Sequence, residues 1–178
     1  MRYQERNDEC RKSYEVAVAQ IPIDQRVYVD ETGFNQPLIR EFAYSLKGVE
    51  VLGERTGKQF ARTSLIAGLH NNKPIAPFEF KGYCDTQVVL TWLENVLLPE
   101  IPKGSTIIWD NASFHKSPKI LALIEDAGCK LLFLPAYSLD LNPIEQFWAW
   151  LKSWIRGLNE PYLHISQALS KVFGKFFI

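Results

Sequence analysis

Three acidic residues at the ends of predicted elements carry the chemistry that this sequence could perform. Asp30 lies near the end of the apolar run RVYVDE, Asp110 follows the apolar run TIIW, and Glu145 lies in the first turn of a predicted helix. Carboxylate oxygens are hard ligands that suit Mg²⁺ or Mn²⁺, and two such ions roughly 3.5 to 4 Å apart can stabilise the attacking and leaving oxygens of a phosphoryl transfer. The three side chains therefore predict a site for two divalent metal ions.

Glu145 also has a simpler structural interpretation. It comes three residues after Asn142, the spacing of a capping box, in which the glutamate bonds back to the start of its own helix. On a helical wheel, however, it shares a face with Lys152 and Arg156 and lies apart from the apolar stripe. That stripe consists of Ile144, Phe147, Trp148, Leu151 and Ile155. The cationic face favours a site that meets phosphate groups.

The two aspartates likewise have both a structural and a functional interpretation. Asp110 and Asn111 could merely end a strand and turn the chain, but the carboxyl ends of strands are where α/β proteins build their sites. Asp30 has the same position after its apolar run. Glu31 is adjacent, and because strand side chains alternate it should point to the opposite face. We therefore assign the metal-ligand role to Asp30.

Basic residues and one histidine are predicted to contact the DNA backbone. They are Arg55, Lys58, Arg62, His115, Lys116, Lys152 and Arg156. Solvated charges on a hairpin explain Arg55, Lys58 and Arg62 equally well. His115 could instead orient a metal ligand or be a surface histidine near a helix start.

Charge and cysteine content narrow the class of protein. Lys plus Arg and Asp plus Glu both number 20 in the 178 residues, so the chain has no global basic field. Its three cysteines, Cys10, Cys84 and Cys129, are far apart and form no CxxC pair, which argues against a zinc site or a disulfide framework. The apolar runs are too short or too interrupted by charge to cross a bilayer. These features predict a cytosolic globular protein with no membrane partner.

The pattern of apolar residues predicts an N-terminal linker helix within residues 1–22 and an α/β domain over residues 23–178. Strands are expected at 26–31, 58–69, 74–81, 106–109 and 129–134, with helices at 86–98, 118–127, 143–156 and 165–173. Residues 70–73 are a turn-rich tetrapeptide suited to a hairpin. The order of elements predicts a mixed five-stranded sheet with helices on its faces.

Several of these motifs together resemble one known family. The segments VYVDETGF, GERTGKQF, APFEFKG, WDNASFHKS and LPAYSLDLNPIEQFWAWLK are similar to the catalytic domain of DDE-superfamily transposases, in the mariner-like bacterial insertion sequence 630 family. The resemblance implies a ribonuclease-H-like fold with Asp30, Asp110 and Glu145 as the catalytic triad. It also implies Mg²⁺ or Mn²⁺ as cofactor, cleavage at transposon ends, and attack of the freed 3′ hydroxyl on target DNA.

The resemblance further implies partners that this chain would need. These are double-stranded DNA, in the form of terminal inverted repeats and target, and a second copy of the protein in a homodimer. Transposases of this family carry an N-terminal helix-turn-helix region, and only about thirty residues precede Asp30. We expect a catalytic half in the bacterial cytoplasm, produced by frameshifting or from a truncated copy. An inactive remnant that only binds DNA or dimerises, and a structure-specific nuclease of the same fold, are the alternatives.

Overall fold

The strands form a single mixed sheet. The computed structural model describes residues 7–34, 45–49, 62–158, 160 and 163–176. Its sheet has five strands in the order β3-β2-β1-β4-β5, in which β1, β2 and β3 are antiparallel neighbours and β4 and β5 run parallel to β1. The bounds are β1 (Arg26–Phe34), β2 (Thr63–His70), β3 (Lys73–Lys81), β4 (Thr106–Trp109) and β5 (Lys130–Phe133). The mixed five-stranded sheet expected from the sequence is confirmed.

The central strand is longer than predicted. β1 pairs with β2 without interruption from Val27, opposite His70, to Phe34, opposite Thr63. Asp30 therefore lies within β1 and not at its end. The hairpin between β2 and β3 is confirmed, because Asn71 and Asn72 both adopt the left-handed backbone conformation that a two-residue turn requires, with φ of 50° and 59°.

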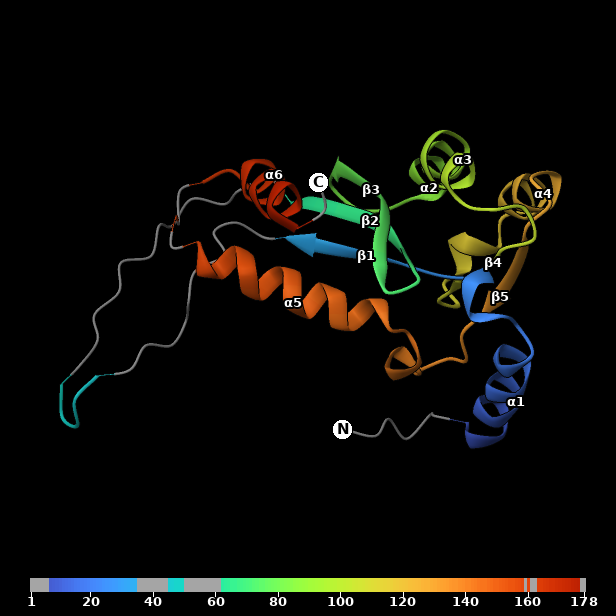
Figure 1. Cartoon of the computed structure of the whole chain (residues 1–178), viewed down its shortest axis with the longest axis horizontal. Coiled ribbons are helices and arrows are strands. Elements are labelled where there is room, and N and C mark those ends of the chain that lie inside the picture. The colour runs from blue at the N-terminus through green and yellow to red at the C-terminus, as the bar shows by residue number, and fades with distance from the viewer. Residues whose placement is uncertain (1–6, 35–44, 50–61, 159, 161–162, 177–178) are drawn as a thin grey trace.

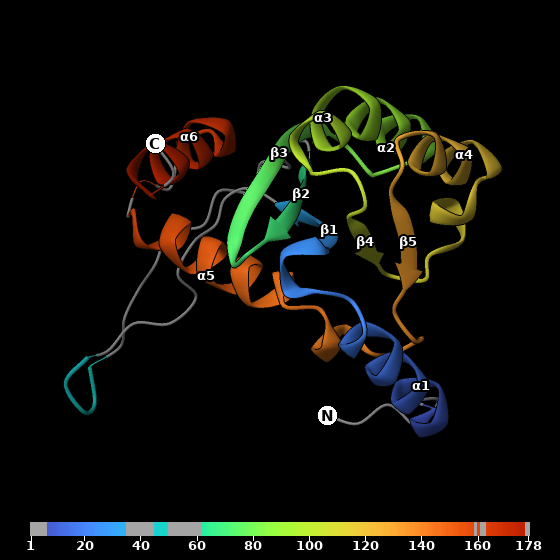
Figure 2. The same ribbon diagram turned by 45° about the vertical axis from the view of Figure 1, so that its right-hand side comes forward.

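Helices cover both faces of the sheet (Figures 1 and 2). The helices are α1 (Asp8–Ala19), α2 (Thr86–Trp92), α3 (Leu98–Glu100), α4 (Pro118–Asp126), α5 (Ile144–Gly157) and α6 (Ile165–Phe176). Val27 and Val29 of β1 share a buried cluster with residues of α2 and α4. Leu65 and Ala67 of β2 belong to a second cluster with α5 and α6. Alternating side chains along the strands thus feed two separate cores.

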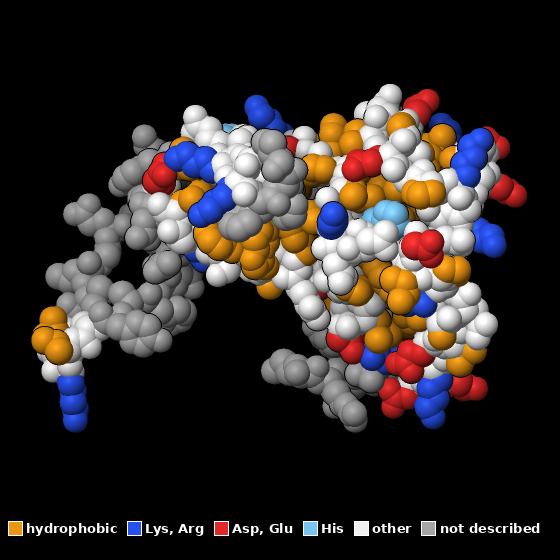
Figure 3. All heavy atoms as spheres, viewed as in Figure 1, with side chains coloured by type: hydrophobic (Ala, Val, Ile, Leu, Met, Phe, Trp, Pro, Cys, Tyr) orange, Lys and Arg blue, Asp and Glu red, His pale blue; other side chains and the backbone are white. Residues whose placement is uncertain are grey.

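The surface carries both signs of charge. Figure 3 shows acidic and basic side chains interspersed on the visible face around α1 and α4, in agreement with the equal totals of 20 in the sequence. Among the helices that the structure describes, none combines the length and apolar character needed to span a membrane.

Helix α1 is held against the rest of the domain. Tyr14, which is buried, and Val18 pack with Ile108 of β4 and with Leu134. Arg11 is only 6% exposed and makes two charge-assisted hydrogen bonds to Asp140, of 2.8 Å from Nη1 to Oδ1 and 2.7 Å from Nη2 to Oδ2. The bidentate pair ties α1 to the turn that precedes α5.

Loss of this ion pair should weaken the fold measurably. Replacing Asp140 with alanine leaves the buried Arg11 guanidinium without its bidentate partner, and the exposed position of Asp140 limits the cost to about 1 kcal/mol of unfolding free energy. Urea denaturation measures this change. The matched control is Lys171→Ala, which breaks an ion pair to Glu160 whose two side chains are both about half exposed. A loss in Asp140→Ala no larger than in the control would contradict the role of the Arg11 pair.

Candidate active site

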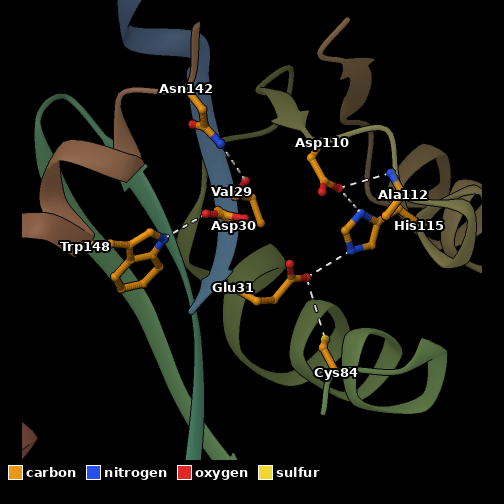
Figure 4. Close-up of polar contacts among 9 residues, drawn as sticks. All are labelled: Val29, Asp30, Glu31, Cys84, Asp110, Ala112, His115, Asn142 and Trp148. Carbon is orange, nitrogen blue, oxygen red and sulfur yellow. Dashed lines mark hydrogen bonds and ion pairs between the residues drawn. The ribbon is translucent and has the colours of Figure 1, made fainter. Parts of the chain in front are cut away.

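The sheet register brings Asp30 and Asp110 to the same level of the neighbouring parallel strands β1 and β4. Tyr28 of β1 lies opposite Ile108 of β4, and each aspartate comes two residues later. Asp30 is 8% exposed, and its Oδ2 accepts a hydrogen bond of 3.0 Å from Nε1 of Trp148 in α5 (Figure 4). The Asp110 carboxylate is turned instead toward His115 (Figure 4).

Asp30 is held in an environment that disfavours its charge. Burial, with the nearby carboxylates of Glu31 and Glu145, raises the pKa of Asp30 to about 8, although backbone and Trp148 N–H donors oppose the shift. Without a cation, Asp30 is therefore mostly protonated at neutral pH. Positive charge placed beside it would favour the ionised form.

Helix α5 presents Glu145 to the same region. Its buried stripe contains Ile144, Trp148, Leu151 and Ile155, as predicted, and Glu145 lies outside it. Burial raises the pKa of Glu145, Lys152 lowers it and Asp110 raises it, with a net upward shift. Glu145 thus interacts electrostatically with both predicted metal-binding aspartates.

The capping interpretation of Glu145 is wrong. The backbone N–H of Asn142, which a capping box would offer to Glu145, donates instead to the carbonyl of Leu139 at 2.9 Å. The Asn142 side chain does not cap α5 either, because its Nδ2 donates to the carbonyl of Val29 in β1 at 3.3 Å. This bond, with that of Trp148 to Asp30, attaches the start of α5 to β1.

The carboxylates supply the right chemistry but do not yet form a ligand cage. Their oxygens are hard donors of the kind that Mg²⁺ and Mn²⁺ bind, and their mutual repulsion is what a divalent cation relieves. Within the residues that the structure describes, no three His, Cys, Asp or Glu side chains are gathered closely enough to hold a metal ion. Hydrogen bonds to Trp148 and His115 turn Asp30 and Asp110 in different directions (Figure 4).

His115 differs from its prediction. Its ring is fully buried, so it cannot contact a DNA backbone in this structure, and the alternative of a surface histidine is wrong as well. Nδ1 lies 2.6 Å from Oδ1 of Asp110 and Nε2 lies 2.9 Å from Oε1 of Glu31. Burial lowers the pKa of His115, but the hydrogen bonds and charges of Asp110 and Glu31 raise it to about 9. The ring is therefore an imidazolium at neutral pH.

This cation acts on Asp110 in turn. Burial raises the pKa of Asp110, but the hydrogen bonds from His115 and the Ala112 N–H, with the charge of His115, bring it below its ordinary value. Asp110 is thus ionised where Asp30 is not. The sequence did predict that Glu31 points away from Asp30, but the roles of Glu31, Asn142 and Trp148 were missed. Only the five-residue spacing from Asp110 to His115 hinted at this contact.

Three of the predicted DNA-contacting residues lie near the carboxylates. The pKa of Lys152 is lowered by burial and responds to Glu145, Arg156, Asp30 and Arg62, so these charges occupy one region. The Arg62 guanidinium lies 4.6 Å from the centre of the Tyr83 ring. A Cβ at position 33 would overlap this guanidinium, so a larger residue in place of Gly33 would displace the end of the Arg62 side chain.

The remaining basic residues are placed differently. Lys116 lies over the ring of Phe133 at the end of β5, with Nζ 5.7 Å from the ring centre. Arg55 and Lys58 lie outside the described residues. A cavity of about 230 Å³ opens beside Asp110 and is lined mainly by residues 134–139, which leaves room for substrate next to this carboxylate.

Comparisons with known proteins agree with this architecture. The family model of the DDE superfamily endonucleases matches residues 25–167. No curated protein matches the sequence significantly. A Mos1 transposase paired-end complex with the left transposon end is similar with a TM-score of 0.75 at 18% identity, over 99% of this chain and 57% of that chain. A Mos1 mariner paired-end complex with Mn gives 0.73 at 19%, over 99% and 57%.

The isolated catalytic domain of Mos1 mariner transposase matches as well, with a TM-score of 0.67 at 16% identity, over 99% of this chain and 84% of that chain. At such identities the likeness shows the fold, and the ribonuclease-H-like fold expected from the sequence is confirmed. The chain spans 57% of the longer Mos1 transposase chain.

Proposed function

The chain belongs to the DDE superfamily endonucleases, and from this we propose that it is a transposase catalytic domain that cleaves DNA at transposon ends and joins the freed 3′ hydroxyl to target DNA. The observation that supports the proposal is that three carboxylates from distant parts of the chain lie in one region of the structure, near enough to influence one another electrostatically. Asp30 and Asp110 lie at the same level of neighbouring parallel strands, and Glu145 on α5 influences the pKa of Asp30.

Asp30, Asp110 and Glu145 would hold Mg²⁺ or Mn²⁺, as a pair of ions. Bound there, the ions would supply Lewis-acid stabilisation of the attacking and leaving oxygens. Mos1 transposase has been solved in paired-end complexes with Mn and with Mg, which supports the choice of metal. The protein's own part is to orient the three carboxylates and, through His115, to keep Asp110 ionised.

The cationic residues near the site would hold the DNA. Arg62, Lys152 and Arg156 lie close to the carboxylates, where a scissile phosphate would sit, and Lys116 extends the contact toward β5. Arg55 and Lys58 remain predicted contacts of the same kind. The paired-end complex of Mos1 with its left transposon end supports transposon-end DNA as a partner. A homodimer and end recognition by a helix-turn-helix region are further parts of the proposal and rest on the family resemblance.

The test is end cleavage by the domain fused to a matching DNA-binding region. With Mg²⁺ we expect nicks that leave 3′ hydroxyls at the transposon ends, and no cleavage when the metal is chelated. The control substrate has scrambled ends. An inactive remnant would bind the DNA without cutting it, and a structure-specific nuclease would cut branched DNA regardless of the end sequence. Either result would refute the proposed function.

A further inference from the structure

A chain of partly buried hydrogen bonds connects Glu31 to Asp110 through the fully buried imidazole of His115. The His115 side chain is 0% exposed, and the side chains of Glu31 and Asp110 are 15% and 33% exposed. The imidazole is stacked on Trp109, with ring centres 4.0 Å apart, and lies against Phe114 at 4.1 Å. The ring is therefore fixed in place by aromatic contacts as well as by its two carboxylate partners.

The chain starts on the side of the central strand opposite to Asp30. Asp30 faces Trp148 of α5, whereas the next residue, Glu31, points the other way and accepts hydrogen bonds from His115 and from Sγ of Cys84 at 3.6 Å (Figure 4). His115 belongs to a short 3-10 helix (Ser113–Lys116) that follows Asp110. β1 can thus act on Asp110 although no direct bond connects them.

The bonds to Asp110 are unevenly distributed over its carboxylate. His115 Nδ1 at 2.6 Å and the Ala112 N–H at 3.2 Å both reach Oδ1. Oδ2 receives no hydrogen bond from any residue that the structure describes. One oxygen is thus held by the protein and the other is left available to a ligand. Histidines and carboxylates behind a metal ligand commonly fix it in this manner.

We propose that His115 and Glu31 are positioning residues, in which Glu31 fixes the His115 ring and His115 fixes the Asp110 carboxylate so that Oδ2 is presented to a divalent cation. The inference rests on the proposed function, because it assigns Asp110 as a metal ligand. It gives the two neighbours in β1 separate tasks. Asp30 would bind the cation itself, and Glu31 would orient the second ligand from behind.

Mn²⁺ titration of the full chain by calorimetry tests this arrangement, with thermal unfolding to confirm that each variant is folded. His115→Ala should weaken Mn²⁺ binding by about 10- to 100-fold, the usual effect of losing such a supporting contact. His115→Asn should recover most of the affinity, because its amide N–H can replace Nδ1 toward Asp110. The matched control is His70→Ala, which removes a histidine bonded to the backbone carbonyl of Asp24 and should bind Mn²⁺ like the wild type.

Variants of Glu31 separate positioning from direct ligation. Glu31→Gln keeps an acceptor for Nε2 of His115 and should bind Mn²⁺ nearly as well as the wild type, whereas Glu31→Ala should bind more weakly. Adding Glu31→Ala to His115→Ala should cause no further loss, since Glu31 acts through His115. These two Glu31 variants keep the test decisive if His115→Ala does not fold.

Failure of the positioning role can be distinguished from failure of the proposed function. If Asp110→Ala abolishes Mn²⁺ binding while His115→Ala and Glu31→Ala leave it unchanged, the positioning role is wrong and the proposed function stands. If Glu31→Gln is as damaging as Asp110→Ala, Glu31 is itself a ligand and the positioning role is likewise wrong. If the wild type shows no carboxylate-dependent Mn²⁺ binding, the proposed function is refuted and this inference with it.

Discussion

Replacing Asp110 with asparagine is expected to lower the rate of transposon-end cleavage by at least about a thousandfold, since a metal ion contributes several kcal/mol to stabilising the transition state of phosphoryl transfer. Asparagine has the same shape, and its Oδ1 can still accept the hydrogen bond from Nδ1 of His115. The substitution therefore removes the charge of a metal ligand while it preserves the local packing. Single-turnover cleavage of end DNA in Mg²⁺ measures the effect.

The matched control for Asp110→Asn removes a carboxylate that lies outside the proposed site. Asp126 is exposed at the end of α4, so Asp126→Asn should cleave at the wild-type rate. Equal rates for Asp110→Asn and the wild type would show that Asp110 holds no catalytic metal. If Asp110→Asn is unfolded at the assay temperature, its loss of activity would reflect misfolding instead. Thermal unfolding is therefore measured on the same preparation.

Binding of Mn²⁺ is expected to become tighter as the pH rises and to level off above about pH 8. Asp30 has its pKa raised to about 8, and a metal ion must displace its proton. Below that pH the affinity should fall by up to tenfold per pH unit, or about 100-fold between pH 8 and pH 6. His115, with a pKa of about 9, stays protonated over this range and adds no slope. Calorimetric titration at several pH values measures the slope.

The raised pKa of Asp30 should also make the stability of the metal-free protein depend on pH. A buried aspartate whose pKa rises from 3.8 to about 8 on folding binds more protons in the folded state. Its contribution to stability is therefore fully present below about pH 4 and is lost as the pH rises toward 8. Asp30→Asn should flatten both this dependence and that of Mn²⁺ binding. A wild-type affinity that does not vary between pH 6 and pH 8 would contradict the assignment.

Trp148 offers an independent check on Asp30. Its indole N–H stabilises the ionised carboxylate, so Trp148→Phe should raise the pKa of Asp30 further. Carbon-13 NMR titration of the Asp30 carboxyl without metal reports the value. Trp92→Phe is the control, because that indole also donates a buried hydrogen bond, at 2.7 Å, but to the carbonyl of Ala76 in the opposite core. If the pKa of Asp30 is unchanged in Trp148→Phe, the hydrogen bond from Trp148 does not help to set that pKa.

Much of the fold could be predicted because its signals are local. Short apolar runs predicted the strands, and the alternation of side chains along a strand predicted the opposite orientation of Asp30 and Glu31. The apolar stripe of α5 and the Asn71-Asn72 turn were also readable from the sequence. Each of these features depends on residues that are neighbours in the chain or on one helix face.

The predictions that were wrong concern groups whose partners are distant in the sequence. Asn142 has the sequence context of a helix cap, but the carbonyl of Val29 in β1 takes its side-chain donor. The helix predicted for residues 86–98 continues past its expected end, because a turn of π-helix (Leu93–Leu97) leads into α3, whose first turn accommodates Pro99. His115 was predicted to contact DNA because nothing near it in the sequence shows that Trp109 and Phe114 lie against its ring. Such contacts depend on the tertiary structure.

The uninterrupted pairing of β1 with β2 has a consequence for how this protein can evolve. Gaining or losing one residue in β1 ahead of Asp30 would exchange the sides on which the acidic neighbours emerge, so each would arrive where the other is needed. Selection should therefore remove insertions and deletions in β1. The pairing of β2 with β3, by contrast, already contains an irregularity between Ile66 and Gly68. Insertions and deletions among related genes are thus expected to accumulate at the outer hairpin and to spare the central strand.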